Sequence, residues 1–413
     1  MAALDRELSG DFEGATSNSN LAPGLDGTLA REIEQRTGIR PAIVYVRTLK
    51  RSADLAAVGS KNPSPDALED TLELTVITAR GRFRRRFPLN YAKLMEQVIQ
   101  LRREVTNPLR THTTTYLAPA QALYGILIKP LKSDLNTQGI TNLVFVAESG
   151  LRSLPYSALH DGKQFLIEQY SLGLMPSLGL TQTNYRNLRN ASLLMVGVSQ
   201  KTQDQTALPM VQTELNTISR IWSSSVQYLN DRATRSTLNT AKQSQNFQIV
   251  HLATHANFVS SKPKDAYIQL WNDRLQLEQM KDLTWNKPGL DLLVLSACRT
   301  AVGDRESELG FAGLAVKTGV KTAIASLWSV NDTATMSLMS KFYDGLLRSP
   351  LKGEALRQAQ LAMIRGTVTI QDNQLLGVGT TGAITLPEAT NSGDTKFTHP
   401  YYWAAFTVVG NPW

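Results

Sequence analysis

The segment Leu293–Thr300 reads LVLSACRT, an apolar run that ends on Cys298. This cysteine is the only one in a chain of 413 residues. A short apolar run followed by polar residues predicts a buried strand that ends in a loop. We therefore expect Cys298 at the mouth of a strand, where the neighbouring Arg299 favours a thiolate. A buried and inert thiol is the alternative for a lone cysteine.

A second apolar run, Gln248–His255 (QIVHLATH), ends on a histidine. Sites in open parallel sheets form beyond the carboxyl ends of the strands. If the two strands are neighbours, His255 and Cys298 emerge at the same edge as a base and a nucleophile.

His251 lies inside the same run, and we expect it to be a satisfied core residue. Four steps along a strand would separate its imidazole from that of His255 by about 13 Å. The pair also lacks the glutamate of a His-Glu-x-x-His zinc motif. We expect neither a metal site nor a cofactor.

The composition is that of an ordinary globular chain, with 42% apolar and 19% charged residues. One cysteine cannot form an internal disulfide, and the first forty residues carry charges where a secretory signal would be apolar. No apolar stretch approaches the length of a membrane span. These features predict a cytoplasmic protein that does not enter a membrane.

The formal net charge of +8 is densest in Arg80–Pro88 (RGRFRRRFP), where arginines alternate with Phe83 and Phe87. Such a pattern could follow a phosphate backbone. A hairpin with arginines outward and phenylalanines inward would show the same residue pattern. We favour the hairpin and do not expect nucleic acid as a partner.

Strand and helix patterns alternate from Pro41 onward, which predicts an α/β fold with a mostly parallel sheet. We expect a polar linker or adaptor over residues 1–38, one α/β half over 39–190 and another over 191–413. Residues 366–398 show no periodicity, so a lid, a self-cleavage site or disorder are all open for them. The expected strands are Ala42–Arg47, Leu72–Ile77, Leu143–Ala147, Leu193–Val198, Phe247–Ala253, Leu290–Ala297, Thr322–Leu327 and Trp403–Val409. The expected helices are Thr28–Arg36, Tyr91–Val105, Ala118–Lys132, Met210–Trp222, Thr234–Ser244 and Thr333–Leu347.

Several motifs give the chain a specific resemblance. Ser296–Thr300 (SACRT) is near the caspase signature Gln-Ala-Cys-Arg-Gly. The ordered set is more similar to the CHAT family, caspase-like domains that occur in bacteria beside tetratricopeptide repeats and are related to separase. The matching segments, within roughly residues 90 to 410, are Leu151–Leu159, His251–Ala256, Leu295–Cys298, Ala325–Asp332, Ala355–Gln360 and His399–Phe406.

This resemblance implies a caspase-like three-layer α-β-α fold in which a degenerate half precedes a catalytic half. It implies a cysteine endopeptidase that works through a thioester acyl-enzyme, with Cys298 as nucleophile and His255 as base. The backbone N–H groups of Ala256 and Cys298 would form the oxyanion hole. Ala256 stands where the family often has glycine, and alanine serves provided that its φ is not positive.

The resemblance also suggests substrate-binding roles for Trp328, Ser329 and Asp332. Asp332 would accept a basic residue before the scissile bond, as the similar segment does in separase, or it would be the N-cap of the following helix. Trp328 would be either a wall of that site or part of the core. The expected partners are a protein substrate and a regulatory or sensor protein that relieves latency. A catalytically silent scaffold that binds a partner is the alternative function.

Overall fold

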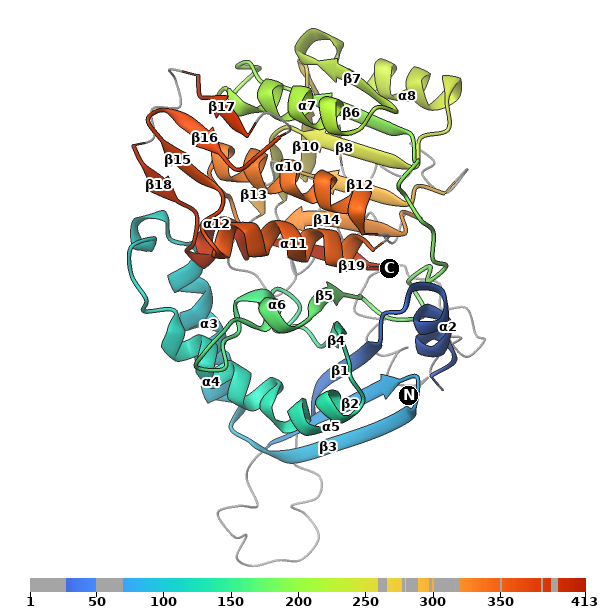
Figure 1. Ribbon diagram of the computed structural model, residues 1–413, viewed down its shortest axis with the longest axis vertical. Helices are drawn as coiled ribbons and strands as arrows, with labels where there is room; N and C mark the ends of the chain where they lie inside the picture. Colours follow the sequence, from blue (N-terminus) through green and yellow to red (C-terminus); the bar gives the residue numbers. More distant parts are fainter. Residues whose placement is uncertain are drawn as a thin grey trace, which may run out of the picture.

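The fold is built on one sheet of eleven strands (Figure 1). The computed structural model describes residues 27–49, 70–258, 266–276, 279, 289–296, 299–300, 316, 319–349, 351–379, 382–387 and 393–413. The strand order across the sheet is β3-β2-β1-β4-β5-β19-β14-β12-β8-β6-β7. These strands are β1 (Pro41–Leu49), β2 (Asp70–Thr78), β3 (Gly81–Leu89), β4 (Asn142–Ala147), β5 (Ser171–Leu174), β6 (Leu193–Gly197), β7 (Ser225–Leu229), β8 (Ile249–Ala253), β12 (Leu292–Leu295), β14 (Thr322–Ser326) and β19 (Phe406–Gly410).

The sheet consists of two parallel blocks that run in opposite directions. In one block β1, β4, β5 and β19 are parallel, with the antiparallel hairpin β2–β3 at its outer edge. In the other, β14, β12, β8, β6 and β7 are parallel. The antiparallel pair β14–β19 joins them. Because of this reversal, the carboxyl ends of the two blocks lie at opposite edges of the sheet.

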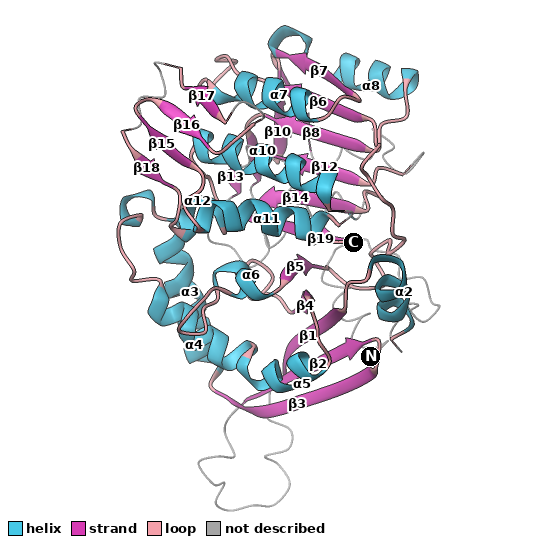
Figure 2. Ribbon diagram, in the orientation of Figure 1, coloured by secondary structure: helices cyan, strands magenta, loops and turns pink. Residues whose placement is uncertain are grey.

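Helices lie on both faces of the sheet, as the alternation of side chains along a strand requires. Val44 of β1 packs into a large cluster with residues of α3 and α4, whereas its neighbour Tyr45 packs into a second cluster with Ile33 of α2. In the other block, α7, α10 and α11 lie side by side over one face (Figure 2). The helices are α2 (Thr28–Thr37), α3 (Tyr91–Thr106), α4 (Leu117–Leu127), α5 (Lys132–Thr137), α6 (Leu166–Gln169), α7 (Met210–Ile221), α8 (Arg235–Ser244), α10 (Asp332–Arg348), α11 (Lys352–Ile364) and α12 (Pro400–Trp403), with 3-10 turns η3 (Pro108–Arg110), η4 (Lys129–Leu131), η5 (Tyr156–Ala158) and η6 (Asn230–Arg232).

The predicted α/β class with a mostly parallel sheet is confirmed. The arginine-rich segment is a hairpin strand, in which Arg82, Arg84 and Arg86 are exposed while Phe83 and Phe87 pack against the core. The short helix expected in the N-terminal linker is α2, which buries Leu29, Ala30 and Ile33 and so belongs to the folded body. None of the helices in the described ranges is long and apolar enough to cross a bilayer.

Residues 366–398 show no periodicity in the sequence, but the part of this segment that the structure describes has regular structure. It forms an antiparallel sheet in the order β17-β16-β15-β18. Asp372 and Asn373 both have positive φ, 49° and 57°, which suits the tight turn between β15 and β16. Strands of two or three residues are too short to show a period in the sequence. The four are β15 (Thr369–Gln371), β16 (Gln374–Leu376), β17 (Ala383–Thr385) and β18 (Thr395–Lys396).

Within the first block, the contact between β5 and β19 depends on side chains as well as on the ladder. Between β5 and β19 the only paired residues are Leu174 and Val409. Arg357 of α11 adds hydrogen bonds to the carbonyls of Ile167 and Glu168, each 2.7 Å long. These contacts hold α11, which packs beside α10, against α6 next to β5.

Gly410, at the end of β19, tests the antiparallel junction between β19 and β14, where it lies opposite Thr322. It has φ 94°, and a Cβ there would lie 2.4 Å from the carbonyl oxygen of Lys321. Gly410→Ala should therefore lower the free energy of unfolding by about 2 to 5 kcal/mol, the combined effect of left-handed strain and overpacking. Gly38→Ala is the matched control, because Gly38 has φ 74° but no described atom within 4 Å of such a Cβ. It should lose only about 1 to 2 kcal/mol. Equal losses in urea unfolding would contradict the tight junction.

Candidate active site

The two strands that carry the predicted dyad are neighbours. β8 and β12 pair in parallel, with Leu252 opposite Leu295. The N–H of Ser296 continues the ladder by donating to the carbonyl of Leu252 at 3.1 Å. His255 follows β8 after one intervening residue, so it stands at the carboxyl edge of the sheet, as the sequence predicted.

Cys298 lies outside the described residues, but the chain on both sides of it is placed. Ser296 continues β12 beside β8, and Arg299 begins β13 (Arg299–Thr300). β13 pairs in parallel with β9 (Ala256–Phe258), with Arg299 opposite Asn257. The chain that flanks Cys298 therefore runs alongside the chain that carries His255.

A backbone carbonyl orients the His255 ring. Nε2 of His255 donates to the carbonyl oxygen of Thr206, 2.9 Å away. A carbonyl oxygen can only accept, so Nε2 carries the proton and Nδ1 is the basic nitrogen of the neutral ring. The sequence analysis missed this contact because a backbone acceptor leaves no signature in residue types.

The loop that supplies this carbonyl is anchored on a second hairpin. Asp204 forms an ion pair with Arg274, and Gln205 donates to the Tyr267 hydroxyl at 3.2 Å. The Thr202 hydroxyl donates to Oδ1 of Asn272 at 3.1 Å. The hairpin consists of β10 (Tyr267–Leu270) and β11 (Asp273–Gln276) and forms a four-stranded sheet with β9 and β13. The same small sheet thus holds both the loop over His255 and the chain after Cys298.

A cavity of about 380 Å³ opens at this edge of the sheet. It is large enough for a peptide side chain and is mostly polar, which suits a substrate with polar groups. Its lining comes from the ends of β8, β12 and β14, from the loop before α7 and from the start of α10. The residues are Asp204, Gln205, Thr206, Leu208, His255, Ser296, Ser326, Ser329, Val330, Asp332, Thr335 and Phe406.

Asp332 lines this cavity and also fixes the loop over His255. Its Oδ2 accepts a hydrogen bond of 2.8 Å from the N–H of Met210, the first residue of α7. Burial raises the pKa of Asp332 to about 6; the Met210 N–H opposes this shift, and the nearby Glu214 carboxylate adds to it. The N-cap of α10 is Asn331, whose side chain accepts from the N–H of Ala334, so the alternative of Asp332 as N-cap is wrong.

The other two residues expected to bind substrate have different positions. Ser329 is exposed and lines the cavity. Trp328 is 2% exposed, and its Nε1 donates to the carbonyl of Tyr401 at 3.1 Å. Of the two interpretations kept for Trp328, the structure shows the core residue.

Ala256 is the first residue of β9 and is buried. Five non-glycine residues of the described chain have positive φ, and Ala256 is not among them. Alanine can therefore replace glycine here without backbone strain.

His251 is buried in the core beneath the site. Its Nδ1 is 3.1 Å from the Tyr343 hydroxyl, and its Nε2 is 2.9 Å from Oε1 of Glu214. Burial, reinforced by the Glu214 carboxylate, raises the pKa of Tyr343 well above its usual value. This polar group links β8 to α7 and α10.

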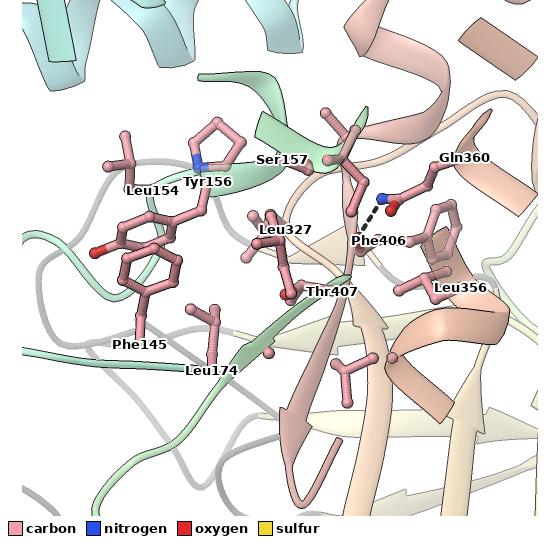
Figure 3. A pocket seen from close by; sticks show the side chains of 17 residues that line it. Phe145, Leu154, Tyr156, Ser157, Leu174, Leu327, Leu356, Gln360, Phe406 and Thr407 are labelled. Atoms are coloured by element: carbon pink, nitrogen blue, oxygen red, sulfur yellow. Dashed lines mark hydrogen bonds between the residues drawn. The ribbon is translucent and has the colours of Figure 1, made fainter. Parts of the chain in front are cut away.

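A second hollow lies beside β5 and β19 and holds only about 20 Å³, room for about one water molecule (Figure 3). Apolar side chains such as Leu174, Leu327 and Leu356 surround it. The Gln360 amide donates to the carbonyls of Trp403 and Phe406 at 3.0 and 3.1 Å. The motif Ala355–Gln360 thus has a structural role beside β19.

A family model described as the CHAT domain matches residues 117–411. Among solved structures, the chain is similar to the separase of Saccharomyces cerevisiae in its complex with securin, with a TM-score of 0.51 and 11% identity over 93% of this chain and 31% of that one. The chain thus spans about a third of that separase chain. It is also similar to the Arg-specific cysteine proteinase gingipain R, with a TM-score of 0.43, 13% identity, and 78% and 75% of the two chains covered. A search of curated proteins gave no match. The similarity to separase shows that the expected caspase-like fold is correct.

Proposed function

Because the chain belongs to the CHAT domain family, we propose that it is a cysteine endopeptidase with Cys298 as nucleophile and His255 as base. The observation that supports this most is the pairing of the chain on both sides of Cys298 with the chain around His255, next to a cavity. We further propose that its substrate is a protein and that a regulatory partner controls access to the site.

The proposed reaction follows from the tautomer of His255. Nδ1 accepts the proton of the Cys298 thiol, and the sulfur attacks the carbonyl carbon of the scissile bond. The N–H groups of Ala256 and Cys298 would stabilise the oxyanion. When the tetrahedral intermediate collapses, the imidazolium gives its proton to the leaving amine and a thioester remains. His255 then takes a proton from water, and the hydroxide releases the acid product and the thiol.

We also propose that Asp332 selects a basic residue before the scissile bond. Its carboxyl group lines the cavity and is desolvated, so an arginine or lysine side chain would gain a strong charge-assisted hydrogen bond there. Ser329 would contribute an exposed hydroxyl at the rim.

The first test is a panel of fluorogenic peptides with different residues before the cleaved bond. Cys298→Ala and His255→Ala should each reduce kcat/KM by at least about 1000-fold, because loss of either member disables the thiolate. An irreversible chloromethyl ketone should label the wild type and leave Cys298→Ala unlabelled. His112→Ala is the control, since His112 is exposed and does not line the cavity.

Labelling by the chloromethyl ketone distinguishes a latent enzyme from an inactive protein, because the reaction requires the dyad but no natural substrate. If neither cleavage nor labelling depends on Cys298, the proposal of an endopeptidase is wrong and a binding scaffold is the remaining function.

The second test concerns Asp332. Asp332→Asn should raise KM about 10- to 100-fold for a peptide with arginine before the scissile bond, because a hydrogen bond between charged groups contributes about 1.5 to 3 kcal/mol. The same variant should change KM little for a leucine peptide. Asp344→Asn, on the same helix but paired with Arg348 on the surface, is the matched control.

The preference should also depend on pH. The pKa of Asp332 is about 6, so the carboxyl is ionised above this value and neutral below it. The ratio of kcat/KM for the arginine peptide to that for the leucine peptide should fall as pH drops through about 6, and the dyad's own titration cancels in this ratio. Asp332 would be excluded as the specificity residue by two results together. The ratio of the arginine peptide to the leucine peptide would be the same in Asp332→Asn as in the wild type, and the wild-type ratio would not change when the pH falls below about 6.

A further inference from the structure

The outer edge of β3 is the end of the central sheet (Figure 1). β3 pairs with β2 along its whole length, from Gly81 opposite Thr78 to Leu89 opposite Asp70. Among the described residues no strand pairs with its other side. A nine-residue edge of this kind is a template for strand addition unless its sequence prevents it.

The side chains of every second residue of β3 lie on the same face of the sheet. The exposed residues are Arg82, Arg84, Arg86 and Pro88. The opposite face carries Phe83 and Phe87, which pack against the core. The three arginines are therefore spaced at the repeat of a strand, about 6.6 Å apart. Side chains on one face of an added strand would have the same repeat.

The backbone N–H and C=O groups of Arg82, Arg84 and Arg86 face the open edge. In an antiparallel ladder alternate residues direct N–H and C=O toward the partner strand, and the others direct them away. Pro88 has no N–H and fits only where that group would point away from β2. The carbonyl of Arg84 accepts from the guanidinium of Arg85 at 3.1 Å, so it also lies outside the β2 ladder. Arg82, Arg84 and Arg86 share this parity.

The positive charge of the β3 edge favours an acidic partner strand. Arg84 and Arg86 share the single carboxylate of Glu73, at 3.5 and 2.5 Å, which leaves an excess of positive charge with Arg82 beside them. A second copy of β3 would place arginines opposite arginines, which disfavours pairing between two copies of the chain. An acidic strand would place carboxylates opposite them.

We propose that the β3 edge binds an extended acidic segment of a partner protein by strand addition. This inference goes beyond the proposed peptidase activity, because β3 is seven strands away from β12 and thus roughly 34 Å from the cavity. The edge is a docking surface for a regulatory protein. Its recognition combines backbone hydrogen bonds with guanidinium–carboxylate pairs.

The probe is a fluorescein-labelled peptide of alternating glutamate and valine, seven residues long, measured by anisotropy at low salt with Cys298→Ala protein. Binding should weaken about 3- to 10-fold in Arg84→Ala, which removes the charge. It should weaken more than 10-fold in Arg84→Pro, which also removes the outward N–H and spares the β2 ladder. Thermal melts of both variants verify folding, and Arg348→Ala, an exposed arginine on α10, is the matched control.

Two N-methylated forms of the peptide test the backbone pairing. Methyl groups on all glutamate amides or on all valine amides block opposite edges of the peptide strand. Strand addition predicts that only one of the two forms still binds. The proposal would be overturned if both methylated forms bound equally well or if the parent peptide did not bind. It would also be overturned if an oligodeoxythymidylate of the same charge bound as tightly as the peptide and Arg84→Pro did not weaken that binding.

Discussion

The parallel ladder between β8 and β12 is the contact on which the proposed chemistry depends. It brings His255 to the same sheet edge as Ser296, two residues before Cys298. The small sheet of β9 and β13 then repeats the alignment on the far side of the cysteine. Two separate ladders thus place Ser296 and Arg299, the described residues on either side of Cys298, beside the chain that carries His255.

The reversal of strand direction at β14–β19 determines which of the two blocks can carry the proposed site. The carboxyl ends of β8, β12 and β14 share one edge, and the carboxyl ends of β1, β4 and β5 share the other. The motif Leu151–Leu159 follows β4 and is buried along its whole length, so it packs against the first block at the opposite edge. Apart from Phe406 at the start of β19, the residues that line the cavity belong to the block of β14, β12, β8, β6 and β7 and to its loops and helices.

The sequence was most informative where a feature shows in residue types. Apolar runs that end on His255 and Cys298 predicted two strand ends, and the alternation of arginine and phenylalanine predicted the β2–β3 hairpin. The sequence was silent where backbone atoms or very short elements matter. The Thr206 carbonyl on His255 has no side-chain signature, and β15 to β18 are too short for a period.

One position shows why neighbouring polar residues are hard to assign. Asn331 and Asp332 are both good N-caps, and the structure uses Asn331 for α10. Asp332 instead binds the N–H of Met210 on another helix and faces the cavity. That contact spans 122 residues of sequence, so only the tertiary fold reveals it.

The pH dependence of Cys298 alkylation tests the central claim most directly. Because Cys298 is the only thiol, the rate of reaction with iodoacetamide reports on this one sulfur without any substrate. If His255 is within reach, the wild-type rate should rise with an inflection well below the pKa of about 8.5 of a free cysteine. His255→Ala should move that inflection back toward about 8.5. Identical profiles for the two proteins would contradict the account, because the imidazole would then not act on the thiol.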